Sequence, residues 1–327
     1  MSTIAPRAAL GPLLPGRGLT NARSLIGWAL FDWAVIAASW IVIAAFESPL
    51  VRVAGIVLVA SRLHALGVIL HDACHRPMRK KTAAWWFVEA LCGWPIGSTI
   101  AAMRYHHLRH HRDSGMRTDP YRHPWLVHGA LVRVALTLRG ALLPFWWTLR
   151  AFVAPLALLV PRARTLYARA FLQDRSGQSL RSNAEVIACA RADLFQAGAH
   201  TVTGAAIVAF DLPFVSCYLL PWMLGGILNA RRVIIEHSFA ENRDRSRATT
   251  LATTRTHDAG RLANWLLYPH HIGFHQAHHL FPTIAFVYLP RVHGQLLGRR
   301  PPTIGENSPA VCRDVARPAP HRLSSQQ

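Results

Sequence analysis

The fold is decided by residues 25–75, which read LIGWALFDWAVIAASWIVIAAFESPLVRVAGIVLVASRLHALGVILHDACH. Residues 25–46 form one apolar run, interrupted only by Asp32, and residues 50–70 form a second. A helix of about 20 apolar residues is long enough to cross the hydrocarbon core of a bilayer. The short polar turn between the runs therefore predicts two antiparallel membrane-spanning helices.

The same pattern recurs at residues 192–210 and 213–228, which are joined by Asp211 and Leu212. Arginine and lysine gather before and after each pair of runs and are scarce in the connecting turns. Positive charge marks the cytoplasmic side of a membrane protein. We therefore expect an all-α integral membrane fold with four transmembrane helices in two hairpins and a cytoplasmic helical cap.

Two further apolar stretches are ambiguous. Residues 83–103 contain glycine and proline, which favours a buried or re-entrant helix, and residues 126–160 carry three arginines, which favours helices lying in the membrane interface. The expected organisation is a flexible N-terminal tail at 1–24, a membrane domain at 25–295 and a disordered C-terminal tail at 296–327.

Composition narrows the function classes. Charged residues make up 16% of the chain, against about 25% in soluble domains, and the formal net charge is +20. The 5 cysteines do not form a disulfide scaffold pattern. The basic residues follow loop positions rather than one soluble face, so we expect no nucleic-acid partner.

Histidine clusters carry the chemistry. His71 and His75 directly follow the second apolar run, and two HxxHH clusters follow at His107, His110 and His111 and at His275, His278 and His279. Residues three and four apart share one face of a helix, so each cluster presents its imidazoles together. His106 is an alternative to His107, but only His107 has the HxxHH spacing.

Eight clustered imidazoles exceed the four ligands of a typical zinc site and suit two metal ions. Two iron ions allow the activation of O2 and attack on an unactivated lipid C–H bond. A metal transporter or sensor would place ionisable groups within the spans, whereas these histidines lie just outside the apolar runs.

The motifs resemble those of the membrane-bound fatty acid desaturases, within the histidine-box di-iron class of desaturases, hydroxylases and ketolases. The resemblance extends from about residue 66 to residue 293 and rests on HDACHRP, RYHHLRHHRDSGMRTDP, RVIIEH and HQAHHLFPTIAFVYLPRVH. It implies nine metal ligands: His71, His75, His107, His110, His111, His237, His275, His278 and His279.

The resemblance further implies two non-haem iron ions, O2 as co-substrate and desaturation of a lipid or fatty acyl chain. The electron donor would be a separate ferredoxin, rubredoxin or cytochrome b5 type of protein. The site and both termini would lie on the cytoplasmic side of the inner membrane. The alternative function is a di-iron hydroxylase or ketolase acting on a carotenoid, sphingoid or other hydrophobic substrate.

Several polar residues near the histidine clusters or within the apolar runs are further candidates, and some of them allow two interpretations. Asp72 either accepts an imidazole N–H or caps a helix, and Glu236 either supports a ligand or is solvated. Asp32, within a predicted span, is expected to form an interhelical hydrogen bond. His64 is either structural or lines the substrate tunnel. Asn229 lies eight residues before His237, where some family members have an asparagine four residues before the corresponding histidine.

Overall fold

The computed structural model describes residues 19–78, 80–122, 129–237, 241–242 and 244–297. Within these ranges the secondary structure is helical apart from two isolated bridges, Leu19–Ile284 and His237–Thr254. The expected all-α fold is therefore confirmed. The predicted tails fall mostly outside the described residues, at 1–18 and 298–327.

The first predicted hairpin consists of α2 (Ala22–Ala45) and α3 (Pro49–Cys74), which pack against each other. The Asn21 side chain caps α2 by accepting a hydrogen bond from the Ser24 amide at 2.9 Å. Helix α2 therefore begins within the predicted tail. Helix α3 has proline at its first position, where no intrahelical donor is lost, and it continues beyond the apolar run through His71.

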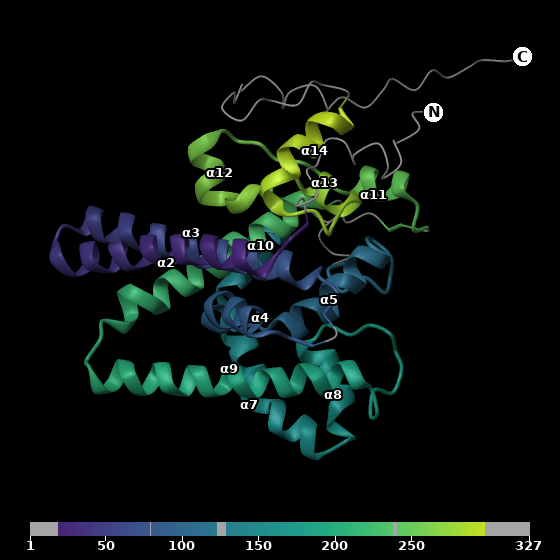
Figure 1. Ribbon diagram of the computed structural model, residues 1–327, viewed down its shortest axis with the longest axis horizontal. Helices are drawn as coiled ribbons and strands as arrows, with labels where there is room; N and C mark the ends of the chain where they lie inside the picture. The colour runs from purple at the N-terminus through teal and green to yellow at the C-terminus, as the bar shows by residue number, and fades with distance from the viewer. Residues whose placement is uncertain (1–18, 79, 123–128, 238–240, 243, 298–327) are drawn as a thin grey trace, which may run out of the picture.

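The second predicted hairpin corresponds to α9 (Ala184–Ala209), a short π-helix η5 (Val215–Leu219) and α10 (Leu220–Glu236). Figure 1 shows the α2–α3 turn and the turn after α9 at the same, left-hand end of the molecule. Helix α10 packs against α3, and both helices end at histidines of the predicted centre. This arrangement brings the carboxyl ends of two long helices to one site.

Among the described residues, three helical stretches are long and apolar enough to cross a membrane: α2, α3 and Ala130–Leu159. Helices α9 and α10 of the second predicted hairpin are not among them, so the four predicted spans stay a prediction. The stretch Ala130–Leu159 comprises α6 (Ala130–Arg139), η4 (Gly140–Leu142) and α7 (Leu143–Leu159), in the region expected to lie in the interface. Arg150 does not snorkel from α7; it is buried and forms an ion pair with Asp193 of α9 at 2.7 Å. The snorkelling expected for Arg150 is therefore wrong, while the position of residues 126–160 relative to the membrane stays a prediction.

The remaining helices surround the long ones. Residues 83–103 form α4 (Ala83–Val88), η1 (Glu89–Gly93), η2 (Trp94–Ile96) and the start of α5 (Ile100–Asp113) rather than one continuous helix. Helix α8 (Ala163–Phe171) packs beside α7. The C-terminal part lies along the top of Figure 1 and consists of α11 (Arg247–Thr253), α12 (Arg261–Leu267), η6 (Pro269–His271), α13 (His275–Leu280), η7 (Phe286–Tyr288) and α14 (Leu289–Leu296).

Two glycines allow α10 to approach its neighbours closely. A Cβ atom on Gly226 would lie 2.3 Å from the carbonyl oxygen of Gly140 in η4, and a Cβ on Gly225 would lie 3.2 Å from the Ala60 carbonyl of α3. Glycine at these positions lets two backbones pack where any larger residue would separate them.

A buried polar network joins the first hairpin to the C-terminal helices. Asp32 of α2 accepts a hydrogen bond from Arg62 of α3 at 3.1 Å and lies 2.7 Å from His270 Nε2. The interhelical bond expected for Asp32 is therefore confirmed. Because His270 precedes His275 by five residues, this contact also holds the segment that leads into α13.

Candidate metal centre

The nine predicted histidines converge into two groups. The ligand atoms of each group all lie within 4.8 Å of one another. One group contains His71, His75, His107, His111 and His278, and the other contains His110, His237, His275 and His279. Residues from α3, α5, α13 and the end of α10 thus meet in one place, although His71 and His279 are separated by more than half of the chain.

Each HxxHH cluster is divided between the two groups. His107 and His111 belong to the first group and His110 to the second, whereas in α13 His275 and His279 belong to the second. Adjacent residues on an α-helix point about 100° apart, while residues four apart point in nearly the same direction. The HxxHH spacing therefore lets one short helix supply a pair to one group and a single ring to the other.

Most neighbouring ring nitrogens share one spacing. Adjacent Nε2 atoms lie 2.9–3.1 Å apart along the series His75, His107, His111 and His278. The corresponding distances are 2.9–3.0 Å along His110, His237, His275 and His279. With metal–nitrogen bonds of about 2.1 Å, ligands at right angles lie about 3.0 Å apart and tetrahedral ligands about 3.4 Å apart. These spacings match ligands at right angles, whereas the 3.4 Å between the Nε2 atoms of His237 and His279 matches tetrahedral ligands, so both groups fit a bound metal ion.

The hydrogen bonds of His110 and His237 show which ring nitrogen carries the hydrogen and which one has a free lone pair. Nδ1 of His110 lies 2.9 Å from Asp119 Oδ1, and Nδ1 of His237 lies 2.9 Å from the Val233 carbonyl oxygen. Each Nδ1–H therefore donates to an acceptor, which leaves a lone pair on each Nε2. The two Nε2 atoms nevertheless lie 2.9 Å apart. Two facing lone pairs repel unless a cation lies between them, so this pair fits a bound metal.

Burial keeps the imidazoles outside the membrane helices neutral. Desolvation by burial is the largest cause that lowers the pKa of His75 and of His237 to about 3, and the positive charge of His110 acts in the same direction at both. Desolvation and the neighbouring rings also hold the pKa well below its ordinary value at His107, His111, His275, His278 and His279. Neutral imidazole is the form that binds a metal ion.

Asp119 is a site residue for which the sequence predicted no role. Besides His110, its carboxylate accepts hydrogen bonds from the amides of Tyr121 at 2.8 Å and Gly115 at 2.7 Å. Burial raises the pKa of Asp119, but His110 and these amides outweigh burial and hold the pKa below its ordinary value. The ionised carboxylate fixes the ring of His110 with Nε2 toward the second group. Its sequence signal was the Asp-Pro pair after the second cluster.

Of the two supporting carboxylates expected from the sequence, Glu236 lies beside a ring. Its Oε2 accepts a hydrogen bond from Arg232 at 2.6 Å and lies 3.4 Å from Nδ1 of His275. Asp72 instead accepts a hydrogen bond from the Thr20 hydroxyl at 2.8 Å, and no described imidazole donates to it. Asp72 directly follows His71 on α3, so it points to a different side of the helix.

Tyr121 is a second residue that the sequence did not single out. Its hydroxyl lies 2.9 Å from His106 Nδ1 and 3.3 Å from His107 Nδ1, and its ring stacks on His110 with centroids 4.4 Å apart. His106 itself belongs to neither group. The HxxHH spacing thus identified the converging ring correctly, and His106 packs behind it.

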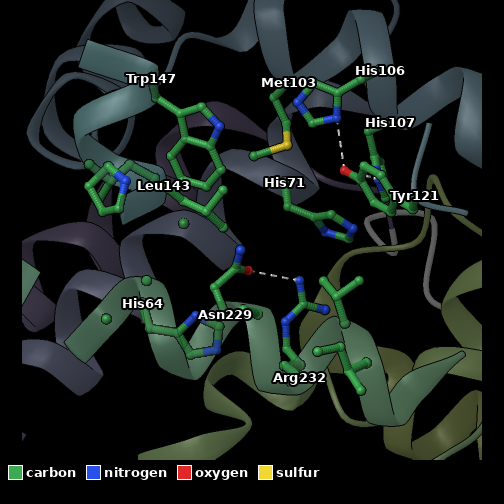
Figure 2. A pocket seen from close by; sticks show the side chains of 18 of the residues that line it. His64, His71, Met103, His106, His107, Tyr121, Leu143, Trp147, Asn229 and Arg232 are labelled. Carbon is green, nitrogen blue, oxygen red and sulfur yellow. Dashed lines mark hydrogen bonds between the residues drawn. The ribbon is translucent and has the colours of Figure 1, made fainter. Parts of the chain in front are cut away.

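A cavity of about 150 Å³ opens onto both histidine groups. His71 and His107 of the first group and His237 and His275 of the second line it. Figure 2 shows Met103, Leu143 and Trp147 on the side of the cavity opposite the α10 residues. The walls are mainly apolar, which suits a hydrocarbon chain held against the two groups.

Comparison with known proteins identifies the family of the chain. No curated protein matches the chain significantly. The family model described as fatty acid desaturase matches residues 47–305, a range that includes every histidine of the two groups. The chain belongs to the fatty acid desaturase family.

Proposed function

We propose that this protein is an O2-dependent di-iron desaturase that introduces a C=C bond into the acyl chain of a lipid or fatty acyl substrate. The nine histidines would hold two iron ions, five around one ion and four around the other. Membership of the desaturase family supports the reaction type. The single observation that carries the proposal is the convergence of two neutral imidazole groups at one apolar cavity.

When bound, such a centre supplies O2 activation: with two electrons and two protons from outside, two hydrogens leave adjacent carbons and two waters form. The protein's own residues prepare this chemistry. Asp119 accepts a hydrogen bond from His110 and orients its ring, and Glu236 places a carboxylate beside the ring of His275. The apolar walls exclude water and hold the chain where its C–H bonds face the histidines.

We propose that α2, α3, α9 and the η5–α10 stretch span the inner membrane as two hairpins. Their turns lie at one end of the molecule, and large apolar side chains near these turns are exposed, including Ile41 at 69% and Val208 at 83%. Asp193, Gln196 and His200 make α9 more polar than α2 or α3, and the first two are buried beside Arg150. The positive flanks support placement of the site on the cytoplasmic side.

Electrons would come from a separate carrier of the ferredoxin, rubredoxin or cytochrome b5 type. Exposed arginines lie on the segments that follow α5 and α10, where Arg117, 84% exposed, pairs with Glu241 and Arg245, 59% exposed, pairs with Asp113. With its formal net charge of +20, the chain suits an acidic carrier, because opposite charge steers association.

The direct test is product analysis. Membranes containing the protein are supplied with defined acyl substrates, and products are identified by mass spectrometry. Desaturation removes two hydrogens, whereas the hydroxylase alternative adds one oxygen. His278→Ala should abolish the product, while His200→Ala, a histidine outside both groups, should retain it. A fully active His278→Ala protein would contradict the proposal.

A further inference from the structure

The cavity contains two polar side chains that the metal chemistry does not use. His64 of α3 lies seven residues before His71, and Asn229 of α10 lies eight residues before His237. At about 1.5 Å per residue, both lie roughly 10–12 Å from the histidine centre along their helices. The two positions are also close laterally, because a Cβ on Gly225, one turn before Asn229, would lie 3.9 Å from the His64 amide nitrogen.

One ring nitrogen of His64 forms a hydrogen bond with a backbone carbonyl at the end of α12. The last carbonyls of α12 accept hydrogen bonds from α3: Arg62 donates to Trp265, Ser61 donates to Leu266 at 2.8 Å, and the His64 ring donates to Leu267. The His64 Nε2 atom has no hydrogen-bond partner in the described part of the chain, although the residue is only 4% exposed. Since the other nitrogen carries the hydrogen, Nε2 is an unused acceptor in the cavity wall.

Asn229 complements this acceptor with an unused donor. Its Oδ1 accepts a hydrogen bond from Arg232 Nη2 at 3.3 Å, and Arg232 is itself held by Glu236. This bond fixes the amide with its Nδ2 group away from Arg232, toward the open side of the cavity in Figure 2. No described group accepts a hydrogen bond from Nδ2. The His64 Nε2 atom is buried without a partner, which costs roughly 1–3 kcal/mol, and Asn229 is half-buried, so a ligand that pairs both groups gains affinity.

We propose that His64 and Asn229 form a subsite for a hydroxyl group on the substrate. The hydroxyl hydrogen would be donated to His64 Nε2, and its oxygen would accept from Asn229 Nδ2. A carbonyl or carboxylate oxygen could satisfy Asn229 but would leave His64 unpaired, because it has no hydrogen to donate. This inference rests on the proposed desaturase function and specifies its substrate class: a lipid with a hydroxyl group about 10 Å from the reacting carbons.

The test measures binding of hexadecanoic acid and a set of hydroxyhexadecanoic acids that differ in hydroxyl position. Binding to the purified protein in detergent is measured by competition with labelled hexadecanoic acid. At least one isomer should bind about tenfold more tightly than the plain acid, equivalent to about 1.4 kcal/mol. The advantage should be confined to one or a few neighbouring positions, since the two polar groups are fixed.

Three variants assign the preference to these residues. Asn229→Leu removes the donor and His64→Phe removes the acceptor, so each should reduce the hydroxyl advantage to less than twofold. Ser61→Ala removes the hydrogen bond to the Leu266 carbonyl at the end of α12, and the tighter binding of the hydroxy acid should persist in this variant. His64→Phe also removes a hydrogen bond to the end of α12, and Ser61→Ala shows whether losing such a bond alone changes the binding preference.

Equal binding of all isomers, failure of every acid to bind, or a preference that survives in both Asn229→Leu and His64→Phe would overturn the subsite. The assay needs no turnover, so it is independent of the iron chemistry. Absence of iron and product with a retained hydroxyl preference would count against the proposed function alone. Desaturation without any hydroxyl preference would count against the subsite alone.

Discussion

The carboxylate of Asp32 and the imidazole of His270 lie 2.7 Å apart, although 238 residues separate them in the chain. Asp32 also holds Arg62, and all three side chains are nearly inaccessible to solvent. The contact fastens the segment that leads into α13 to the α2–α3 hairpin. The third histidine cluster is therefore positioned by a polar contact made within a predicted membrane helix.

Asp32→Ala should destabilise the protein strongly, because it leaves Arg62 buried without its counterion. Removing one partner of a buried pair costs about 3–5 kcal/mol, whereas replacing both by apolar residues is often tolerated. The Asp32→Leu/Arg62→Met double variant should therefore recover part of the loss. Thermal unfolding in detergent measures the stability of the single and the double variant. Equal stability of Asp32→Ala and the unmodified protein would show that the network is not important for the fold.

Asp119→Asn should weaken metal binding by roughly 10- to 100-fold, because the ring of His110 loses the charged acceptor that orients it. Asp113→Asn is the matched control: Asp113 is equally buried but pairs with Arg112 and Arg245 rather than with a histidine. Iron titration of the metal-free protein measures the two affinities. A similar loss in both variants would assign the effect to the local fold instead of His110.

Gly226→Ala should reduce both stability and activity, because the added Cβ would collide with the Gly140 backbone and displace α10 from the cavity wall. Gly198→Ala is the matched control, at a glycine with open space around its Cβ position. Apart from the backbone of α9 itself, no atom of the described residues lies within 4 Å of the position of its Cβ, so alanine should stabilise α9 by about 0.5–1 kcal/mol. Unfolding in detergent compares them, and an unaffected Gly226→Ala protein would refute the close approach.

The metal-free protein should lose stability as the pH falls from about 6.5 toward 3. The folded pKa values of His75 and His237 are lowered to about 3 by burial, so the unfolded chain binds more protons in this window. Each histidine then contributes a slope of up to about 1.4 kcal/mol per pH unit. Replacing both by glutamine should flatten the dependence of the melting temperature on pH. An unchanged slope would show that other groups control acid unfolding.

The sequence predicted the parts of the fold that follow from local periodicity. The apolar runs indicated the α2–α3 hairpin, and the HxxHH spacing indicated which rings share a face. It did not predict that His110 and His278 join opposite groups, because that depends on how α5 and α13 face each other. It also did not predict that Arg150 is buried in an ion pair, because its partner Asp193 is 43 residues away.

The most direct test of the central claim is the iron content of the purified protein and of two single variants. The unmodified chain should bind about two irons. His278→Ala removes a ring from the five-histidine group and His279→Ala removes one from the four-histidine group. Each variant should lose about one iron and keep the other. One metal ion per chain, preferential retention of zinc, or variants that both keep two irons would contradict the two-group centre.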